Sequence, residues 1–370
     1  MRLLVFHPTI APYRIDLFNA LDRDFTLKVC LAYSNLRDQT FSDYDKILSS
    51  LSFEPHYLSK RFTLLNRVVS SGYWKEINKF KPDIVMVSEF GLDAIAALTY
   101  KSLHKANYKI VSICDDSFDM INSGNDFSKV HATMRKFIAP RLDGLILVEP
   151  KVAEWYDSHD CRSTFFPIVA DETRLRKEYQ QALSESNSLI DEYGLQSQKV
   201  FLFVGRLVPQ KNIPTLISAF NKANTPDSKL VIVGDGSERV ALENQVRQSK
   251  RSEDIIFTGR LEGLKLYAWY NLASCFVLPS IQEPFGAVTG EALTGGCFSL
   301  VSDRAGSNCL IENGVNGFTF NPEDIENLAS KMQSSLIKPC ERLSELRNSL
   351  MPKSFEQYYT ELSLFLKSTV

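Results

Sequence analysis

The 370-residue sequence lacks several features that would place it in a specialised class of protein. It has no excess of one charge, because 42 Lys and Arg side chains face 44 Asp and Glu side chains for a net charge of −2. Such a chain is not expected to bind nucleic acid through a basic surface. It also has no uncharged run near the ~18 apolar residues that a membrane-spanning helix needs. With 44% hydrophobic and 23% charged residues it has the composition of globular domains.

The seven cysteines are odd in number and never follow the C-x-x-C spacing. We therefore expect buried, free cysteines in a reducing compartment rather than disulfides or zinc ligands. The N-terminal M-R-L-L-V-F-H-P runs directly into an apolar strand and lacks the basic segment and cleavage site of a signal peptide. These features predict a cytoplasmic protein.

Short runs rich in Val, Ile and Phe alternate with helical patterns, which is typical of βαβ units and parallel sheets. In the first half, strands are predicted at Leu3–Phe6, Leu27–Ala32, Ile84–Ser88, Ile110–Ile113 and Gly144–Val148, with helices starting near Pro12, Asn66, Gly91 and Ser128. In the second half, strands are predicted at Val200–Val204, Lys229–Val233, Ile255–Thr258, Cys275–Leu278 and Phe298–Ser302, with helices starting near Ile213, Ser237, Lys265, Gly286 and Ser307. The fold class is thus α/β, with one doubly wound sheet in each half.

This pattern divides the chain into four parts. Residues 1–170 form the first sheet domain and residues 199–352 the second, while the polar stretch 171–198 is expected to be an interdomain connection with a solvated helix. Residues 353–370 are expected to form a helix whose apolar face needs a partner surface outside the second sheet; this face consists of Phe355, Tyr358, Tyr359, Leu362 and Phe365.

Two carboxylates stand out in the loop after Cys275–Leu278, which reads P-S-I-Q-E-P-F-G-A-V-T-G-E-A-L. Glu283 precedes a helix expected from Phe285 or Gly286, and Glu291 lies about two turns along it. Amides at the start of that helix, those of Phe285, Gly286 and Ala287, are free to bind oxygens of a ligand. The structural alternative is a capping carboxylate followed by a solvated one.

A basic pair follows the strand Val200–Val204, in the segment G-R-L-V-P-Q-K-N. Gly205 is expected at a tight turn, with Arg206 and Lys211 at the carboxyl end of the sheet. Ligands of doubly wound sheets bind at that end, and an Arg with a Lys suits a diphosphate. Two solvated cations in a loop are the alternative.

These segments together carry a family resemblance. G-R-L-x-x-x-K-N, V-I-V-G-D-G-S-E, F-T-G-R-L, S-I-Q-E-P-F-G-A-V-T-G-E-A-L-T-G-G and N-G-V-N-G-F follow one another between about Val200 and Asn321. In this order they resemble the C-terminal half of family 4 glycosyltransferases of the GT-B fold. The resemblance implies retaining transfer of a sugar from a nucleotide-sugar donor, without a metal or other cofactor, in a cleft between two Rossmann-like domains.

The resemblance implies that the helix expected in residues 353–370 crosses back to the first domain, and it also implies roles for individual residues. Arg206 and Lys211 correspond to the diphosphate-binding pair, Glu291 to the contact with the ribose hydroxyls, and Glu283 to the contact with donor-sugar hydroxyls beside the reacting carbon. The remaining donor-binding positions are the backbone donors Phe285, Gly286 and Ala287, the turn glycines Gly205, Gly234 and Gly236, and the pair beside the nucleobase, Gly259 and Arg260.

The first half departs from the family pattern after its first strand. Many members carry a Gly-Gly loop there, whereas this chain reads H-P-T-I-A-P-Y-R and resembles the bacterial transferases that build cell-surface polysaccharide such as O-antigen, capsule or exopolysaccharide. The cleft-facing candidates are His7, the amides near Ala11, and Arg14. The alternative is that Pro12 opens a helix and Arg14 is its solvated face.

A second departure follows the strand Ile110–Ile113, where many members place a His near the reacting sugar. Here Asp115 and Asp116 are the catalytic candidates, since an Asp can accept a proton from the acceptor or orient the donor sugar; a helix cap is the alternative. Glu89, after the strand Ile84–Ser88, is a further residue expected to face the acceptor.

The acceptor is expected to be a glycan or a lipid-linked glycan, and a lipid carrier would bring the protein to the cytoplasmic surface of the inner membrane. The candidate contact is S-K-R-F-T-L-L-N-R, where Lys60, Arg61 and Arg67 alternate with apolar residues, although a solvated loop fits equally well. Two other functions share the expected architecture: a nucleotide-sugar 2-epimerase and a non-catalytic nucleotide-sugar-binding paralogue.

Overall fold

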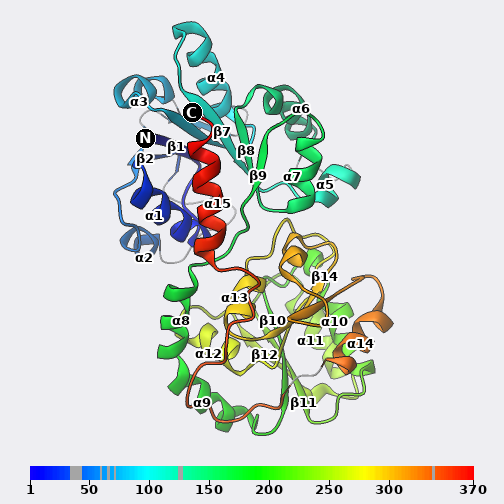
Figure 1. Ribbon diagram of the computed structural model, residues 1–370. Coiled ribbons are helices and arrows are strands. Elements are labelled where there is room, and N and C mark those ends of the chain that lie inside the picture. Colours follow the sequence, from blue (N-terminus) through cyan, green and yellow to red (C-terminus); the bar gives the residue numbers. More distant parts are fainter. Residues whose placement is uncertain (34–43, 59–60, 65–66, 71, 124–127, 336–337) are drawn as a thin grey trace. The chain divides into compact units, whose positions relative to one another are not determined.

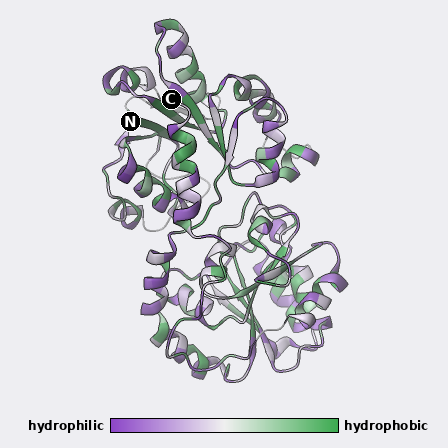
Figure 2. Ribbon diagram, in the orientation of Figure 1, coloured by the Kyte–Doolittle hydropathy of each residue, from purple (hydrophilic) through white to green (hydrophobic). Residues whose placement is uncertain are grey.

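The computed structural model describes residues 1–33, 44–58, 61–64, 67–70, 72–123, 128–335 and 338–370. The chain folds into two compact units (Figure 1). Unit 1 consists of Met1–Ile168 with Glu356–Val370, and unit 2 of Val169–Phe355. Figure 2 shows the central strands of both units in green, the hydrophobic end of its scale, as expected for sheets that are covered on both faces.

Unit 1 contains a seven-stranded parallel sheet with the order β3-β2-β1-β6-β7-β8-β9. Its strands are β1 (Arg2–His7), β2 (Thr26–Leu31), β3 (His56–Tyr57), β6 (Ile84–Ser88), β7 (Lys109–Cys114), β8 (Gly144–Leu147) and β9 (Ser163–Phe165). A separate antiparallel hairpin is formed by β4 (Arg61–Leu64) and β5 (Arg67–Ser70).

Helices cover both faces of this sheet. They are α1 (Ile15–Asp24), α2 (Tyr44–Ser49), α3 (Tyr73–Phe80), α4 (Leu92–His104), α5 (Phe118–Ser123), α6 (Lys129–Ile138), α7 (Pro150–Asp157) and α15 (Phe355–Lys367), with short 3-10 helices at Pro12–Arg14 and Ala139–Arg141. Buried residues of α3, α4, α6 and α7 share one apolar cluster with the strands. On the other face, the ring of Phe365 of α15 lies over Gly144, where an added Cβ would be only 2.7 Å from it.

Helix α15 joins unit 1 although it is the last element of the chain. Tyr358, Tyr359 and Leu362 are buried, and so is Leu366, which was not among the expected positions. The Tyr359 hydroxyl donates to the main-chain oxygen of Ala20 over 2.6 Å.

Unit 2 contains a six-stranded parallel sheet with the order β12-β11-β10-β13-β14-β15. Its strands are β10 (Lys199–Val204), β11 (Ser228–Val233), β12 (Ile255–Gly259), β13 (Cys275–Leu278), β14 (Phe298–Ser302) and β15 (Gly317–Phe320). The helices are α8 (Glu172–Gln181), α9 (Leu183–Tyr193), α10 (Ile213–Lys222), α11 (Arg239–Arg247), α12 (Leu264–Leu272), α13 (Val288–Thr294) and α14 (Ile325–Ser334), with 3-10 helices at Pro209–Lys211, Ser252–Asp254 and Gly306–Leu310. Alternate strand residues pack on α8, α9 and α12 on one face and on α10, α11 and α14 on the other.

The expected fold class, two doubly wound α/β sheets, is confirmed, and several details differ. The helix expected from about Asn66 begins at Tyr73, after the β4–β5 hairpin. The strands β3, β9 and β15 were not expected, because each has at most four residues and lies at a sheet edge. Residues 171–198 contain helices α8 and α9 of unit 2, not a solvated segment, because Leu175, Tyr179 and Ile190 pack into its core.

Two expectations from composition can be compared with the structure. All seven cysteines are free, and six of them are buried. Within the described ranges, no helix is long and apolar enough to cross a membrane.

Candidate active site

The sheet order of unit 2 brings two loops together. β10 pairs with β13, while β11 and β12 lie on one side of them and β14 and β15 on the other. The loops after β10 and β13 therefore leave neighbouring strands in opposite directions around the sheet, and doubly wound sheets bind ligands at the carboxyl edge where this happens. The Lys211 ammonium from the first loop forms an ion pair with the Glu283 carboxylate from the second. A main-chain hydrogen bond of 2.9 Å from Ile281 to the oxygen of Gln210 ties the same loops together.

The two cationic side chains at this edge of the sheet, Lys211 and Arg206, differ in their surroundings. The Lys211 side chain is only 15% exposed and the Glu283 side chain 13% exposed, so each charge is neutralised mainly by the other. Arg206 is exposed, and its guanidinium has no hydrogen-bond or ion-pair partner among the described residues. The site thus holds one paired and one unpaired cation.

The loop after β13 is fixed through its backbone. The Gly306 amide donates to the oxygen of Glu283 over 3.1 Å, and the Ser307 amide to the oxygen of Phe285 over 2.8 Å. Gly286 has a φ of 92°, and a Cβ there would lie 2.7 Å from Leu278 Cδ2. The amides of Phe285, Gly286 and Ala287 donate no hydrogen bond within the part of the chain that the structure describes. Three donors therefore remain for a ligand, although helix α13 begins only at Val288.

Glu291 lies one turn into α13. Its Oε2 accepts from the Tyr270 hydroxyl over 2.9 Å, and its main-chain oxygen accepts from the Tyr179 hydroxyl over 2.8 Å. Burial raises the pKa of the Glu291 carboxyl, and the hydrogen bond from Tyr270 partly opposes this shift. The carboxyl is thus held in one orientation.

Glycine is required where the loops after β10 and β11 touch. A Cβ on Gly234, whose φ is 145°, would lie 1.8 Å from the oxygen of Gly205, and one on Gly236 would lie 2.4 Å from the oxygen of Leu207. The end of β12 adjoins this turn, because the Gly234 amide donates to the oxygen of Gly259 over 2.9 Å. The next residue, Arg260, is exposed and pairs with Glu262.

Unit 1 has its own change of strand order between β1 and β6, with β2 and β3 on one side and β7 to β9 on the other. His7 is the last residue of β1, and Ala11 and Arg14 follow it in the next loop and its 3-10 helix. Arg14 is 3% exposed and ion-paired with Asp115 from the loop after β7, so it is not a solvated helix residue, although Pro12 does open a 3-10 helix. Ala11 is buried, and its oxygen accepts from the Arg14 amide over 2.9 Å.

His7 closes β1 as a neutral imidazole. Burial and the nearby Arg14 cation lower the pKa of His7 to about 4. Its Nδ1–H donates to the oxygen of Thr9 over 2.6 Å, because a carbonyl oxygen can only accept. The Nε2 atom is then a hydrogen-bond acceptor.

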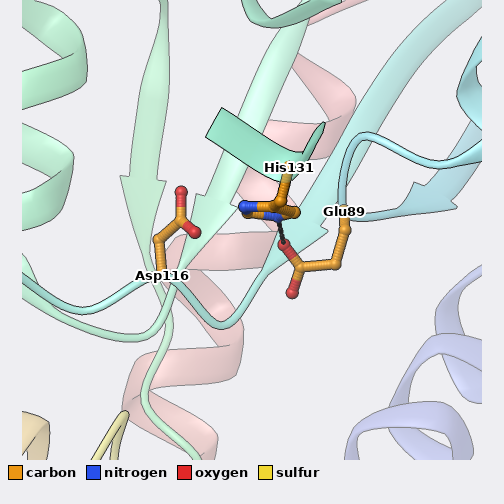
Figure 3. A group of neighbouring side chains, drawn as sticks. All are labelled: Glu89, Asp116 and His131. Atoms are coloured by element: carbon orange, nitrogen blue, oxygen red, sulfur yellow. Dashed lines mark hydrogen bonds and ion pairs between the residues drawn. The ribbon is translucent and has the colours of Figure 1, made fainter. Parts of the chain in front are cut away.

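The loops after β6 and β7 bring the candidates Glu89, Asp115 and Asp116 together, and Figure 3 shows Glu89 and Asp116 beside His131 of α6. The Glu89 Oε1 accepts from the Asp115 amide over 2.8 Å, and its Oε2 lies 3.4 Å from His131 Nε2. Asp116 has no exposed surface: Arg135 binds it with two hydrogen bonds of 3.0 Å, and the Tyr156 hydroxyl donates to it over 2.7 Å. Its carboxylate therefore has no surface to offer a ligand.

Asp115 and Asp116 do not cap helix α5. The first amide of that helix, Phe118, donates instead to Glu149 Oε2 over 2.8 Å. His131, which lies at the start of α6, was not among the sequence candidates. Its partner Glu89 is 42 residues away, so no local pattern could have indicated it.

Glu89, Asp116 and His131 each offer one ligand atom within 4.8 Å of the others, which raises the question of a metal. The Arg135 guanidinium, however, already occupies both oxygens of Asp116. A divalent cation would lie against this cation, so the donor set does not suit a metal ion.

Comparisons with known proteins identify the second half of the chain. Residues 187–354 match the family model described as "Glycosyl transferases group 1". An uncharacterized glycosyltransferase of Methanocaldococcus jannaschii is 38% identical over 133 residues, which are 36% of this chain and 34% of that protein. The sulfoquinovosyl transferase of Arabidopsis thaliana is 27% identical over 304 residues, which are 79% of this chain and 56% of that protein. The match with the first of these relatives thus spans about a third of its length.

Most of the chain has the fold of a solved two-domain structure. The crystal structure of HepE from Anabaena in complex with UDP has a TM-score of 0.70 and 18% identity, and the match covers 89% of this chain and 88% of that one. Residues 187–354 thus match the glycosyltransferase group 1 family model, within a chain that has the two-domain GT-B fold.

Proposed function

We propose that this protein is a glycosyltransferase that moves a sugar from a nucleotide-sugar donor to a hydroxyl of a glycan or lipid-linked glycan. The observation that carries the proposal is the set of polar groups that the loops after β10 and β13 place at the carboxyl edge of unit 2. It combines the exposed Arg206, the Lys211–Glu283 ion pair and three main-chain amides that donate no hydrogen bond among the described residues. Cations and fixed amides of this kind suit the oxygens of a diphosphate and a sugar.

The proposed roles follow from this chemistry. Arg206 and Lys211 hold the donor diphosphate and stabilise the negative charge that develops when its bond to the anomeric carbon breaks. Glu283 and the amides of Phe285 to Ala287 bind hydroxyls of the donor sugar. Glu291, oriented by Tyr270, binds the ribose hydroxyls. Gly259 and Arg260 lie beside the nucleobase.

UDP is the first nucleotide to test. HepE has been crystallised with UDP, with UDP and glucose, and with UDP-glucose. Because HepE shares only 18% identity with this chain, it suggests a starting point for a donor screen rather than a donor.

We further propose a retaining reaction without a metal, in bacterial cell-surface polysaccharide synthesis. Support for metal independence comes from Arg206 and Lys211, two cationic side chains at one sheet edge that can bind diphosphate oxygens in place of a metal. The cytoplasmic location and a peripheral contact with the inner membrane surface are part of the same proposal. Of the three basic residues proposed to contact the membrane, Lys60 lies outside the described residues, while Arg61 and Arg67 belong to the β4–β5 hairpin.

A donor screen tests the proposal. Full-length protein would be mixed with UDP-, GDP-, ADP- and dTDP-sugars, with and without EDTA, and binding and release of the nucleoside diphosphate measured. We expect one nucleotide class to bind and to be hydrolysed slowly in both conditions. Release of a free sugar with inverted C2 would indicate a 2-epimerase, and binding without turnover in the presence of glycan acceptors would indicate a non-catalytic paralogue. Loss of turnover in EDTA that Mg²⁺ restores would contradict metal independence.

A further inference from the structure

Glu89 is held in an unusual backbone conformation at the carboxyl edge of unit 1. Its φ is 57°, in the left-handed region that residues other than glycine seldom adopt without support from their surroundings. The neighbouring strand holds it there: its amide donates to the oxygen of Ile113 over 3.0 Å, and its oxygen accepts from the Ser112 hydroxyl over 2.6 Å. This backbone fixes the direction in which the Glu89 carboxyl points.

The carboxyl itself is oriented from two sides. The Asp115 amide donates to Oε1, and His131 Nε2 faces Oε2 (Figure 3). The side chain nevertheless remains 27% exposed, whereas Asp116 beside it has no exposed surface. Of the two carboxylates that flank His131, only Glu89 can therefore touch a ligand.

A chain of hydrogen bonds determines which proton His131 carries. Arg135 is held by Asp116, and its NH2 group lies 3.4 Å from His131 Nδ1. Because a guanidinium can only donate, Nδ1 accepts and the proton of the neutral ring is on Nε2. The Nε2–H then points at the Glu89 carboxylate.

The charges around Glu89 come from two loops and one helix. Asp115, Asp116 and His131 face it directly, Arg14 neutralises Asp115, and Arg135 neutralises Asp116. Burial raises the pKa of Glu89 to about 7, while the hydrogen bond from His131 acts in the opposite direction. A carboxyl of this kind can exchange a proton at neutral pH.

We propose that Glu89 is the catalytic base that removes the proton from the acceptor hydroxyl, and that His131 is the residue that positions its carboxylate. The inference rests on the proposed glycosyl transfer. The acceptor O–H bond breaks and its proton passes to a carboxylate oxygen of Glu89. The acceptor oxygen forms a bond with the anomeric carbon, and the bond from that carbon to the diphosphate breaks, its electron pair leaving with the nucleoside diphosphate.

The test uses the full-length protein and hydrolysis of the nucleotide sugar that it binds, with water in place of the acceptor hydroxyl. Glu89→Gln keeps an oxygen that can accept from the Asp115 amide but cannot take a proton. We expect the rate to fall at least about a hundredfold, with unchanged affinity for the donor. In the wild type the rate should rise with pH and level off above a midpoint near pH 7.

A matched control is Asp93→Asn. Asp93 follows the same strand, is buried, and accepts from the Ser88 amide over 2.8 Å, and burial raises the pKa of Asp93 to about 6. Its hydrogen bonds go to the backbone of Ser88 and Ala94 and not to Glu89, so its variant should keep both the rate and the midpoint near pH 7. A midpoint that disappeared in this control would assign the titration to Asp93 and overturn the proposal.

Two substitutions of His131 separate positioning from simple packing. His131→Phe removes the N–H that favours ionised Glu89, so the midpoint of the pH profile should move at least about half a unit upward. His131→Gln keeps an N–H donor and should restore the midpoint. A rate loss with the same midpoint in both variants would show that His131 only packs.

The outcomes distinguish this inference from the function on which it rests. If Glu89→Gln hydrolysed the donor at the wild-type rate with the same pH profile, the departing diphosphate would be the base and the assignment would be wrong, while glycosyl transfer would stand. If the wild type bound and turned over no nucleotide sugar with any acceptor, the proposed function would fail, and the role of Glu89 with it.

Discussion

The Lys211 ammonium and the Glu283 carboxylate form an ion pair that joins the loops after β10 and β13. These loops leave adjacent strands at the point where the strand order reverses. A donor diphosphate would therefore meet a lysine that already has an anionic partner, and an arginine that has no partner among the described residues. The two cations should respond differently to substitution.

Arg206→Ala should weaken donor binding without destabilising the protein. The guanidinium is exposed and has no partner in the described ranges, so nothing there depends on it for stability. We expect the Kd for the nucleotide sugar to rise by about 10- to 100-fold, as for the loss of one charge-assisted contact of about 1.5–3 kcal/mol. Titration calorimetry would measure it, and an unchanged Kd would remove Arg206 from the site.

Lys211→Ala should affect both donor binding and the stability of the protein. It removes a diphosphate contact and also leaves the largely buried Glu283 carboxylate without its partner. We expect weaker donor binding together with a lower free energy of unfolding, by about 1–3 kcal/mol. The double variant Lys211→Met with Glu283→Gln should regain part of this stability but none of the binding. Equal stability of the single variant and the wild type would show that the ion pair contributes little.

Gly234→Ala should destabilise unit 2 severely. The added Cβ would lie 1.8 Å from the oxygen of Gly205, so the turns after β10 and β11 would have to separate. Gly194→Ala is the control, because its φ of 60° is also positive but no atom lies within 4 Å of the new Cβ. Denaturant unfolding should show a loss of about 1 kcal/mol for the control and several for Gly234→Ala. Similar losses would mean that backbone conformation, not contact, requires Gly234.

The strands of unit 2 and the place of several polar residues at its sheet edge could be predicted because their signals are local. β6 and β13 begin and end at the predicted residues, since a buried parallel strand is a continuous apolar run between polar loops. Arg206, Lys211 and Glu283 lie in loops directly after such strands, so their place at the sheet edge follows from the strands themselves. That Lys211 pairs with Glu283 could not be predicted, because it depends on the strand order β10-β13.

The polar cluster of unit 1 was less accessible to prediction. Arg14 and Asp116 are charged residues in polar loops, and only the packing of α6, α7 and the loop after β7 buries them against Asp115, Arg135 and Tyr156. Helices α8 and α9 were misjudged for a related reason. Their few apolar residues are spread among many charged ones, and only their contact with α12 shows that they belong to the core.

Glu89→Gln should make the protein more stable at pH 8. Between the ordinary pKa of 4.5 and the folded pKa of about 7, folded Glu89 keeps a proton that the unfolded chain has lost. The stability associated with that proton is present below pH 4.5 and is lost as pH rises through about 7. The variant has no such loss, so relative to the wild type it should gain about 3 kcal/mol between pH 4.5 and about pH 8.

Unfolding in urea across this pH range would measure the difference. Asp93→Asn gives a comparison, because the pKa of Asp93 in the folded protein is about 6. The gain in stability of this variant over the wild type should therefore be complete about one pH unit lower than that of Glu89→Gln. A difference between Glu89→Gln and the wild type that did not change with pH would contradict the raised pKa of Glu89.

The last prediction concerns helix α15, which packs on unit 1 although more than half of the chain separates it from that unit's other elements. Leu362 is fully buried there, whereas Leu364, two residues further along the helix, is 63% exposed. Leu362→Ala should lower the free energy of unfolding by about 2–5 kcal/mol, because it leaves a cavity under the helix. Leu364→Ala removes the same atoms at the surface and should change it by less than about 0.5 kcal/mol. Thermal unfolding of both variants would measure the contrast, and amide hydrogen exchange should show faster exchange in α1 and α15 of the first variant, where the Tyr359 hydroxyl binds the oxygen of Ala20. Equal losses in the two variants would mean that α15 does not pack on unit 1 in solution.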